Sequence, residues 1–377
     1  MRRRRRAYLD DPDAWSVTVD RLERFDLELW MRREAVRARL VIGGSGVPTR
    51  DVSPYVPVDL DAAWHEHPDH AAQRVCEGVA REYGLDPREV VTTLGASEGD
   101  FLVALALAGP GAHVVVEEPA YFSLRAPAAA LRCRVTRVRR RPEDAFALSR
   151  DEVLASMRPD TRLVALARPN NPTGAVVPDA DLVAIAERAE RCDAFVLVDE
   201  VFADATSLGD RPARLLHDRI VSVNSVTKCL GFGPLKVGWC VASPEAGARI
   251  ERAKGHVVPV NPHLGPRIAE RVLSERRKLV AECRAAREVG VGLVRDFAEA
   301  RGLGWSGAGH GTTCLVRLPG GAGDDVAFAR RLLEAHGVLV APGAFVEIPG
   351  WIRLGLVTPR DDLEAGLRAL ARATDEG

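Results

Sequence analysis

The sequence predicts an α/β protein with a mostly parallel central sheet. Between residues 70 and 245, segments with helical periodicity alternate with short apolar runs, which is typical of a parallel sheet covered by helices. The apolar runs are rich in Val, Leu and Ile, as strands buried on both faces are. Three of these runs end in a polar residue. Because open α/β sheets bind ligands at the carboxyl ends of their strands, the pattern also predicts where the site lies.

The expected elements follow from these patterns in chain order. Helical patterns cover residues 71–83, 98–108, 121–131, 149–157 and 179–192. Strand patterns cover residues 90–94, 113–117, 134–139, 163–167, 195–199, 220–226 and 237–242.

The pattern changes after residue 245. Charged helical segments at 246–253 and 266–301, the second with a possible break, are followed by strands near 313–318 and 350–356 around a helix near 325–336. Without strict alternation, these elements predict a smaller α+β domain assembled from both chain ends. We expect residues 1–44 and 256–377 to form this small domain, and residues 45–255 to form the large one.

Composition and charge exclude several classes of protein. The 377 residues carry a formal net charge of −1, which gives no reason to expect nucleic acid or an anionic membrane as partner. The longest apolar stretches, such as Phe101–Ala108, are too short to span a bilayer. Five arginines follow Met1, but no apolar segment comes next, so a secretory signal is not expected. Seven scattered cysteines without a C-x-x-C pair argue against disulfides or a zinc site and favour a cytoplasmic location.

The three polar strand ends suggest a specific cofactor. Asn171 follows the strand pattern at 163–167, Asp199 ends the one at 195–199, and Lys228 follows the one at 220–226. A lysine can form a Schiff base, an aspartate can hold a protonated ring nitrogen, and an asparagine can donate a hydrogen bond to a phenolic oxygen. Pyridoxal 5'-phosphate needs these partners from a protein. The sequence therefore predicts a pyridoxal-phosphate enzyme.

Three motifs extend this prediction to a family. Residues 169–174 (PNNPTG) contain an N-P-T-G element, and residues 199–202 (DEVF) correspond to a D-E-x-Y element. Residues 225–228 (SVTK), with Gly231, Lys236 and Gly238 after them, correspond to an S-x-S-K-x-x-G-x-x-x-x-R-x-G element. In this order and at strand ends, the motifs make the chain similar to the class I/II aminotransferases of the fold-type I pyridoxal-phosphate enzymes. The resemblance covers nearly the whole chain.

The resemblance implies a role for each matching position. Lys228 would be the catalytic residue, and Arg353, between Ile352 and Leu354 on a strand, would bind the substrate α-carboxylate together with Asn171. The implied cofactor contacts are Ala96, Ser97, Glu98, Tyr121, Asn171, Asp199, Phe202, Ser225 and Lys236. No metal is expected.

Ordinary structural roles remain open for several of these residues. The loop at 95–99 lies between a strand and a helix, where free N–H groups favour a phosphate; alternatively, Ser97 caps the helix with Asp100 completing a box. Asp199 could cap a helix or form an ion pair, and Asn171 could be a turn residue. Tyr121 could be plain core, and Arg353 could be a surface arginine.

The chain departs from the family pattern at four places. The tyrosine of D-E-x-Y is Phe202, so its hydrogen bond to the cofactor 3-oxygen is missing. The phosphate-binding arginine is Lys236, a point charge in place of a bidentate fork. Pro234 occupies a usual glycine position. The segment 64–70 (WHEHPDH) replaces a tyrosine region; it could hold a metal, but a loop bordering the active site is favoured.

We therefore expect an aminotransferase that acts on an L-amino acid and a 2-oxo acid. Lys228 would hold the cofactor and then transfer the proton at the substrate Cα as general acid and base. The resemblance also implies a homodimer. The alternative keeps the cofactor but carries out elimination, cyclisation or oxidation of an amino acid, because the departures change groups around the cofactor. A cofactor-binding regulatory domain is disfavoured, because no DNA-binding extension is visible in the sequence.

Overall fold

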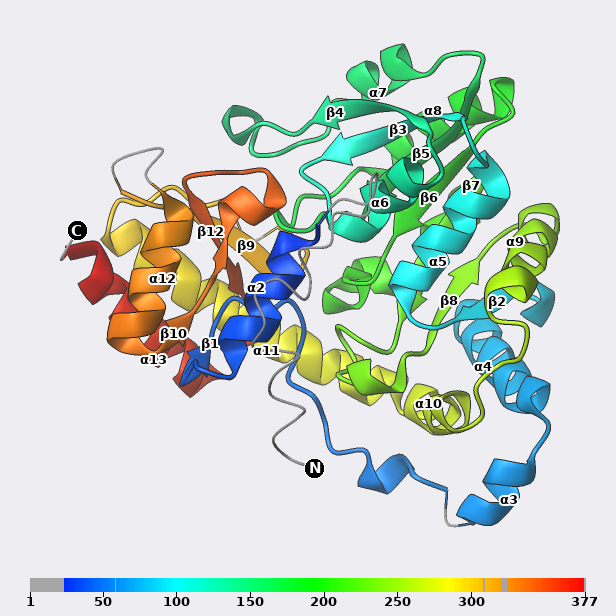
Figure 1. The fold of residues 1–377 in the computed structure, drawn as a ribbon, viewed down its shortest axis with the longest axis horizontal. Helices are drawn as coiled ribbons and strands as arrows, with labels where there is room; N and C mark the ends of the chain where they lie inside the picture. The colour runs from blue at the N-terminus through cyan, green and yellow to red at the C-terminus, as the bar shows by residue number, and fades with distance from the viewer. Residues whose placement is uncertain (1–23, 58, 308, 320–323, 376–377) are drawn as a thin grey trace.

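The computed structural model describes residues 24–57, 59–307, 309–319 and 324–375. Figure 1 shows a larger part built around a sheet and a smaller part that contains both ends of the described chain. The first 23 residues of the expected 1–44 segment lie outside the described residues. The α/β fold with a smaller α+β part is as the sequence predicts.

The large part is built on a seven-stranded sheet. Its strands are β2 (Val90–Thr93), β3 (His113–Glu118), β4 (Arg134–Arg139), β5 (Thr161–Ala167), β6 (Phe195–Asp199), β7 (Ile220–Ser225) and β8 (Gly238–Val241). They are arranged in the order β2-β8-β7-β6-β5-β3-β4. Neighbouring strands from β7 to β4 run parallel, whereas β8 is antiparallel to both β2 and β7. The carboxyl ends of β5, β6 and β7 therefore lie side by side.

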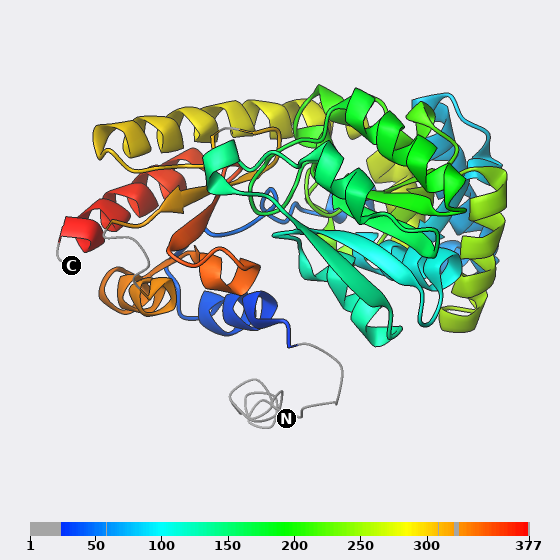
Figure 2. The same cartoon turned by 90° about the horizontal axis from the view of Figure 1, so that it is seen from above.

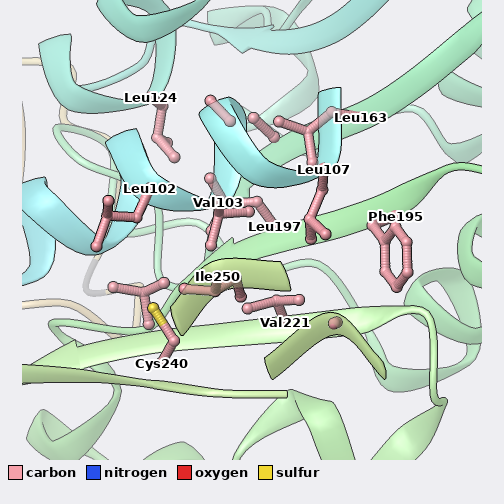
Figure 3. Packing of buried hydrophobic residues seen from close by; sticks show 14 of the residues in the cluster. Leu102, Val103, Leu107, Leu124, Leu163, Phe195, Leu197, Val221, Cys240 and Ile250 are labelled. Carbon is pink, nitrogen blue, oxygen red and sulfur yellow. The ribbon is translucent and has the colours of Figure 1, made fainter. Parts of the chain in front are cut away.

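Helices cover both faces of this sheet. They are α4 (Pro68–Tyr83), α5 (Ala96–Val103), α6 (Phe122–Ala130), α7 (Arg150–Ser156), α8 (Asp179–Arg191) and α9 (Pro244–Val257). Apolar side chains of α5, α6 and α9, such as Leu102, Leu124 and Ile250, pack on β-strand residues that include Leu197 and Val221 (Figure 3). A separate buried cluster joins α7 and α8 to the opposite face. Near-complete burial explains the continuous apolar sequence of the strands, except for the edge strand β4, whose residues are mostly exposed and alternate between polar and apolar.

The smaller part joins the two ends of the chain. Strand β1 (Leu40–Val41) pairs in parallel with β10 (Val338–Leu339). Strands β11 (Ala341–Pro342), β12 (Trp351–Gly355) and β9 (Thr313–Arg317) form an antiparallel sheet. Helices α2 (Asp26–Ala35), α12 (Asp325–His336) and α13 (Arg360–Asp375) pack around these strands, as Figure 2 shows from above.

The boundary between the two parts lies further along the chain than the expected residue 255. Helix α10 (Leu264–Ser274) packs on α4, and its Ile268 and Val272 share a core with Trp239 of β8. The long helix α11 (Arg276–Ala300) then runs from the large part into the small one (Figure 1). Glu275 separates α10 from α11, which is the break expected within 266–301. In the described residues, no helix is both long and apolar enough to cross a bilayer.

Candidate active site

A cavity of about 210 Å³ lies at the carboxyl ends of β5, β6 and β7. Its walls come from both parts of the molecule, since α2 of the small part contributes Glu28. The lining residues are Glu28, Gly95, Ala96, Ser97, Tyr121, Ser123, Ala167, Asn171, Asp199, Val201, Phe202, Ser225, Thr227, Lys228 and Lys236. Eight of the nine expected cofactor contacts and the expected catalytic lysine are among them.

Lys228 follows β7 and presents a half-buried amine to this cavity. Its Nζ donates to Ser45 Oγ at 2.9 Å, and its carbonyl accepts from the Val47 amide at 2.9 Å. Loss of hydration, followed by the positive charge of Arg353, lowers the pKa of Lys228 to about 8. A larger share of the amine is therefore neutral, and so nucleophilic, near neutral pH than for an ordinary lysine. Sequence reasoning missed Ser45; the glycines on either side of it, which permit a close approach of the chain, were the available signal.

Asp199 ends β6 and is buried. One carboxylate oxygen, Oδ1, accepts from the Val201 amide at 2.9 Å. Burial raises the pKa of Asp199 to about 6, an effect that this amide and the charge of Lys228 partly oppose. A buried carboxylate is stabilised by a cationic or hydrogen-bonding partner. Asp199 is therefore suited to hold a protonated ring nitrogen in the cavity.

The start of α5 has no side-chain cap. Gly95 occupies the N-cap position, and no side chain accepts a hydrogen bond there. Asp100 instead is fully buried and accepts from Ser123 Oγ at 2.6 Å. Its Oδ1 has no hydrogen-bond partner among the described residues, and burial together with the charge of Asp199 raises the pKa of Asp100. The alternative in which Ser97 and Asp100 cap the helix is therefore wrong.

The ammonium of Lys236 lies beside the uncapped start of α5, where backbone N–H groups have no side-chain acceptor. Gly95 has a φ of +83°, and a Cβ there would lie 3.6 Å from Lys236 Nζ. The Ser225 hydroxyl accepts from the Thr227 amide at 3.3 Å and keeps its own proton to donate. Free N–H groups, a hydroxyl and an ammonium form a favourable environment for a phosphate.

Glu98 is the expected cofactor contact that does not line the cavity. Its carboxylate accepts from the Leu94 amide, and the residue lines a neighbouring small cavity with Thr92 and Lys254. The side chain is therefore turned back toward the end of β2. Of the loop residues expected to bind phosphate, Ala96 and Ser97 line the cavity.

Aromatic and amide groups complete the walls. Tyr121 is half-buried at the start of α6, and its ring contacts Phe25 edge-on at a centroid distance of 5.2 Å. Phe202 is buried and offers only a ring where the family pattern has a phenol. Asn171 is buried, and its Oδ1 accepts from Arg353 Nη1 at 3.3 Å.

Arg353 lies behind Asn171 on β12 and is buried. Its Nη2 donates to the Gly43 carbonyl at 2.9 Å, while Nε has no partner among the described residues. Burial lowers the pKa of Arg353 to about 10. A carboxylate bound beside it would supply the charge and acceptor that this guanidinium lacks. The surface-arginine alternative does not hold.

The histidines at 65, 67 and 70 lie away from this cavity and are exposed. His65 lies 3.5 Å from Asp61 within α3 (Leu60–His65), and His67 Nδ1 accepts from the Asp69 amide to cap α4. In the described part of the chain, His, Cys, Asp and Glu side chains form no group that could hold a metal. This segment is a helix–helix connection.

Comparison with known proteins places these residues in a family. The family described as aminotransferase class I and II matches residues 61–370, which is most of the chain. The chain belongs to the class I and II aminotransferases. The match includes the three strand-end motifs and Arg353.

Individual relatives are similar over most of their length. An arginine–pyruvate transaminase from Pseudomonas aeruginosa is 32% identical over 316 residues, covering 81% of this chain and 80% of that protein. A capreomycidine synthase from Streptomyces vinaceus is 30% identical over 375 residues, covering 92% of both proteins. A transaminase and a synthase thus match this chain at similar sequence identity.

Solved structures share the fold. A pyridoxal-phosphate-dependent aminotransferase from Streptococcus suis superposes with a TM-score of 0.84 at 22% identity, covering 94% of this chain and 98% of that one. The aspartate aminotransferase of Thermus thermophilus, solved with maleate, gives a TM-score of 0.80 at 24% identity, covering 93% and 97%. These structures confirm the predicted fold-type I architecture.

The residues of the cavity fit pyridoxal phosphate, the cofactor of this family. Asp199 is a buried carboxylate suited to a ring nitrogen, and the uncapped start of α5 with Lys236 is suited to a phosphate. Lys228 lines the same cavity as both groups. The donor set therefore matches the cofactor at both of its charged ends.

Proposed function

We propose that this chain transfers the amino group of an L-amino acid to a 2-oxo acid with pyridoxal phosphate bound at Lys228. The observation that carries the proposal is that Lys228, Asp199 and Asn171, from three separate strand ends, line one cavity. Family membership supports the reaction, since class I and II aminotransferases include transaminases. The cofactor supplies an aldehyde that takes up the amino group and a ring that withdraws electrons from the substrate Cα.

Each residue would then act on one part of the reacting system. Arg353 would hold the substrate α-carboxylate, with Asn171 fixing the guanidinium through their 3.3 Å hydrogen bond. The contact between Arg353 and the substrate carboxylate would orient the Cα–H bond toward the amine of Lys228. Lys228 Nζ, whose pKa is lowered to about 8, takes the proton from Cα as general base and returns a proton as general acid.

Asp199 and the phosphate site would keep the cofactor in place during this transfer. The Asp199 carboxylate keeps the ring nitrogen protonated, which the Val201 amide supports by fixing Oδ1. Lys236, Ser97 and Ser225 would hold the phosphate at the start of α5. With both ends fixed, the proton donor and acceptor atoms stay within reach of each other.

The experiment follows both halves of the reaction. The purified protein is supplied with pyridoxal phosphate and pyruvate and screened against single L-amino acids. Transamination predicts equal amounts of alanine and of the 2-oxo acid derived from the amino acid. Consumption of many equivalents of an amino acid per active site without formation of alanine would overturn the proposal.

A second candidate is elimination or cyclisation of an amino acid on the same cofactor. Two observations favour it: the capreomycidine synthase is 30% identical over 92% of the chain, and Phe202 replaces the phenol of the family pattern. Such an enzyme would consume its amino acid repeatedly with no 2-oxo acid present. The same screen without pyruvate separates the two candidates.

We also propose that the protein is a cytoplasmic homodimer. The seven cysteines, all in described residues, are free, which suits a reducing compartment. Helix α3 extends from the body of the large part (Figure 1) and exposes Leu60 and Trp64. Analytical ultracentrifugation would test the dimer, and a monomer at micromolar concentration would contradict it.

A further inference from the structure

Glu28 forms part of the wall of the active-site cavity. It is the third residue of α2, in the small part, and it lines the cavity opposite residues of the large part. Its side chain is 39% exposed, and its Oε1 accepts from Arg32 Nε at 2.7 Å. An i,i+4 ion pair this exposed contributes little to stability. The carboxylate can therefore exchange this partner at little cost.

The other charged groups at the cavity already have a role in the proposed function. Asp199 would face the ring nitrogen and Lys236 the phosphate, while Lys228 would act on the Cα proton; Arg353, behind Asn171, would bind the substrate α-carboxylate. Only two of the lining residues are carboxylates, Asp199 and Glu28. Glu28 is thus the charged lining group that neither the cofactor nor the common part of an amino acid uses.

The negative charge of Glu28 acts on three residues that would surround the substrate: Lys228, Tyr121 and Arg353. It raises the pKa of Lys228 against the effect of lost hydration, and it does so more than Asp199. It also raises the pKa of Tyr121 and opposes the lowering at Arg353. These three residues would contact the amino group, the cofactor ring and the carboxylate. Because Glu28 lines the same cavity, it places a negative charge on the wall of the space that the amino acid would occupy.

We propose that Glu28 determines substrate specificity by binding a cationic side chain of the amino acid. This inference rests on the proposed function and adds the substrate class to it: an L-amino acid with a guanidinium or ammonium group at the end of its side chain. Arg353 would hold one end of the substrate, so the substrate side chain would extend toward Glu28, the lining carboxylate that the cofactor does not use. Glu28 already accepts a hydrogen bond from the guanidinium of Arg32, and a substrate guanidinium would replace this partner.

The test measures binding to the holoenzyme with ligands that cannot react. The compound 5-guanidinopentanoate is arginine without its α-amino group, and 5-ureidopentanoate is its neutral counterpart of nearly the same shape. Calorimetry gives the ratio of their two Kd values in the wild type, in Glu28→Gln and in Glu34→Gln. Glu34 is the matched control, because it lies on the same helix and pairs with Arg37 at 2.9 Å but does not line the cavity.

The expected wild-type ratio is about tenfold in favour of the guanidino compound, the size of one charge-assisted hydrogen bond at a partly exposed site. The ratio should fall to about one in Glu28→Gln and stay at the wild-type value in Glu34→Gln. Equal affinity for both ligands in the wild type would overturn the inference. An unchanged ratio in Glu28→Gln would overturn it as well.

The two proposals fail in different ways. If the wild type forms no 2-oxo acid from any amino acid, the proposed function fails, while the affinity ratio still reports on Glu28. If the wild type transaminates neutral amino acids and binds the guanidino and ureido compounds with equal Kd, only the inference on Glu28 fails. Where the ratio does favour the guanidino compound, comparing L-arginine with L-lysine as substrates shows whether a guanidinium or an ammonium is preferred.

Discussion

Arg353 donates from Nη1 to Asn171 Oδ1 at 3.3 Å. The residue expected to bind the substrate carboxylate is thus hydrogen-bonded to the residue expected to contact the cofactor. Both side chains are buried, one on β12 of the small part and one after β5 of the large part. Because Arg353 also donates to the Gly43 carbonyl, its guanidinium has a fixed position. The residues expected to bind the substrate and the cofactor are therefore joined by hydrogen bonds.

Two neighbouring asparagines should differ in what their replacement by alanine affects. Asn171→Ala should mainly lower activity, and Asn170→Ala should mainly lower the stability of the fold. Asn171→Ala should lower kcat/KM by about tenfold or more, since one hydrogen bond to a charged group is lost, with a smaller loss of stability than Asn170→Ala. Asn170 instead donates to Glu117 and to the Pro119 carbonyl in the core. Asn170→Ala should reduce the free energy of unfolding by about 2–3 kcal/mol. Steady-state kinetics and urea unfolding measure both; a stable Asn170→Ala protein would contradict this division.

The amine of Lys228 should react with pyridoxal phosphate in a pH-dependent way. Only the neutral amine attacks an aldehyde, so the rate of cofactor uptake by cofactor-free protein should rise with pH, with a midpoint near 8. The charge of Arg353 disfavours the ammonium form, so Arg353→Gln should move the midpoint to higher pH. Stopped-flow absorbance gives the rate, and Lys228→Ala is the blank. A midpoint near the ordinary 10.5 would show that the amine is well hydrated.

Lys236 should contribute to phosphate binding through its charge. Lys236→Ala should weaken cofactor affinity by about tenfold or more, whereas Lys236→Arg should retain most of it. Titration of cofactor-free protein with pyridoxal phosphate measures each Kd. Lys278→Ala serves as the control, because that lysine is 70% exposed on α11 and outside the cavity. Equal affinity in all four proteins would place the Lys236 ammonium elsewhere.

Phe202→Tyr should restore the phenol of the family pattern. The added hydroxyl would donate to the cofactor 3-oxygen and favour its ionised form, which disfavours protonation of the nitrogen attached to Lys228. The pH midpoint of the change in cofactor absorbance should therefore fall. Titration followed by absorbance checks this shift. An unchanged midpoint would mean that the position of residue 202 is out of reach of that oxygen.

The parts of the site that lie on strand ends could be predicted from the sequence. Asn171, Asp199 and Lys228 follow three apolar runs, and parallel pairing brings such ends together whatever the loops do. The long helices and the break before α11 could also be predicted from the sequence, because helical periodicity and charge are local signals. The same holds for the fold class.

The rest of the site depends on tertiary contacts that leave no local pattern. Ser45 meets Lys228 from 183 positions away in the sequence, and Glu28 enters the cavity on a helix of the small part. Asp100 looks like a capping residue in sequence, yet Gly95 begins the helix and Asp100 turns inward to Ser123. Two-residue strands such as β1 are too short for any periodicity to show.

The stoichiometry of a reaction without acceptor tests the central claim most directly. The holoenzyme is mixed with one reactive amino acid, no 2-oxo acid is added, and the product released per active site is counted. A transaminase retains the amino group on its cofactor after one half-reaction, so the account predicts about one 2-oxo acid per site and then no further release. Many turnovers per site without an acceptor would contradict transamination and favour elimination, cyclisation or oxidation.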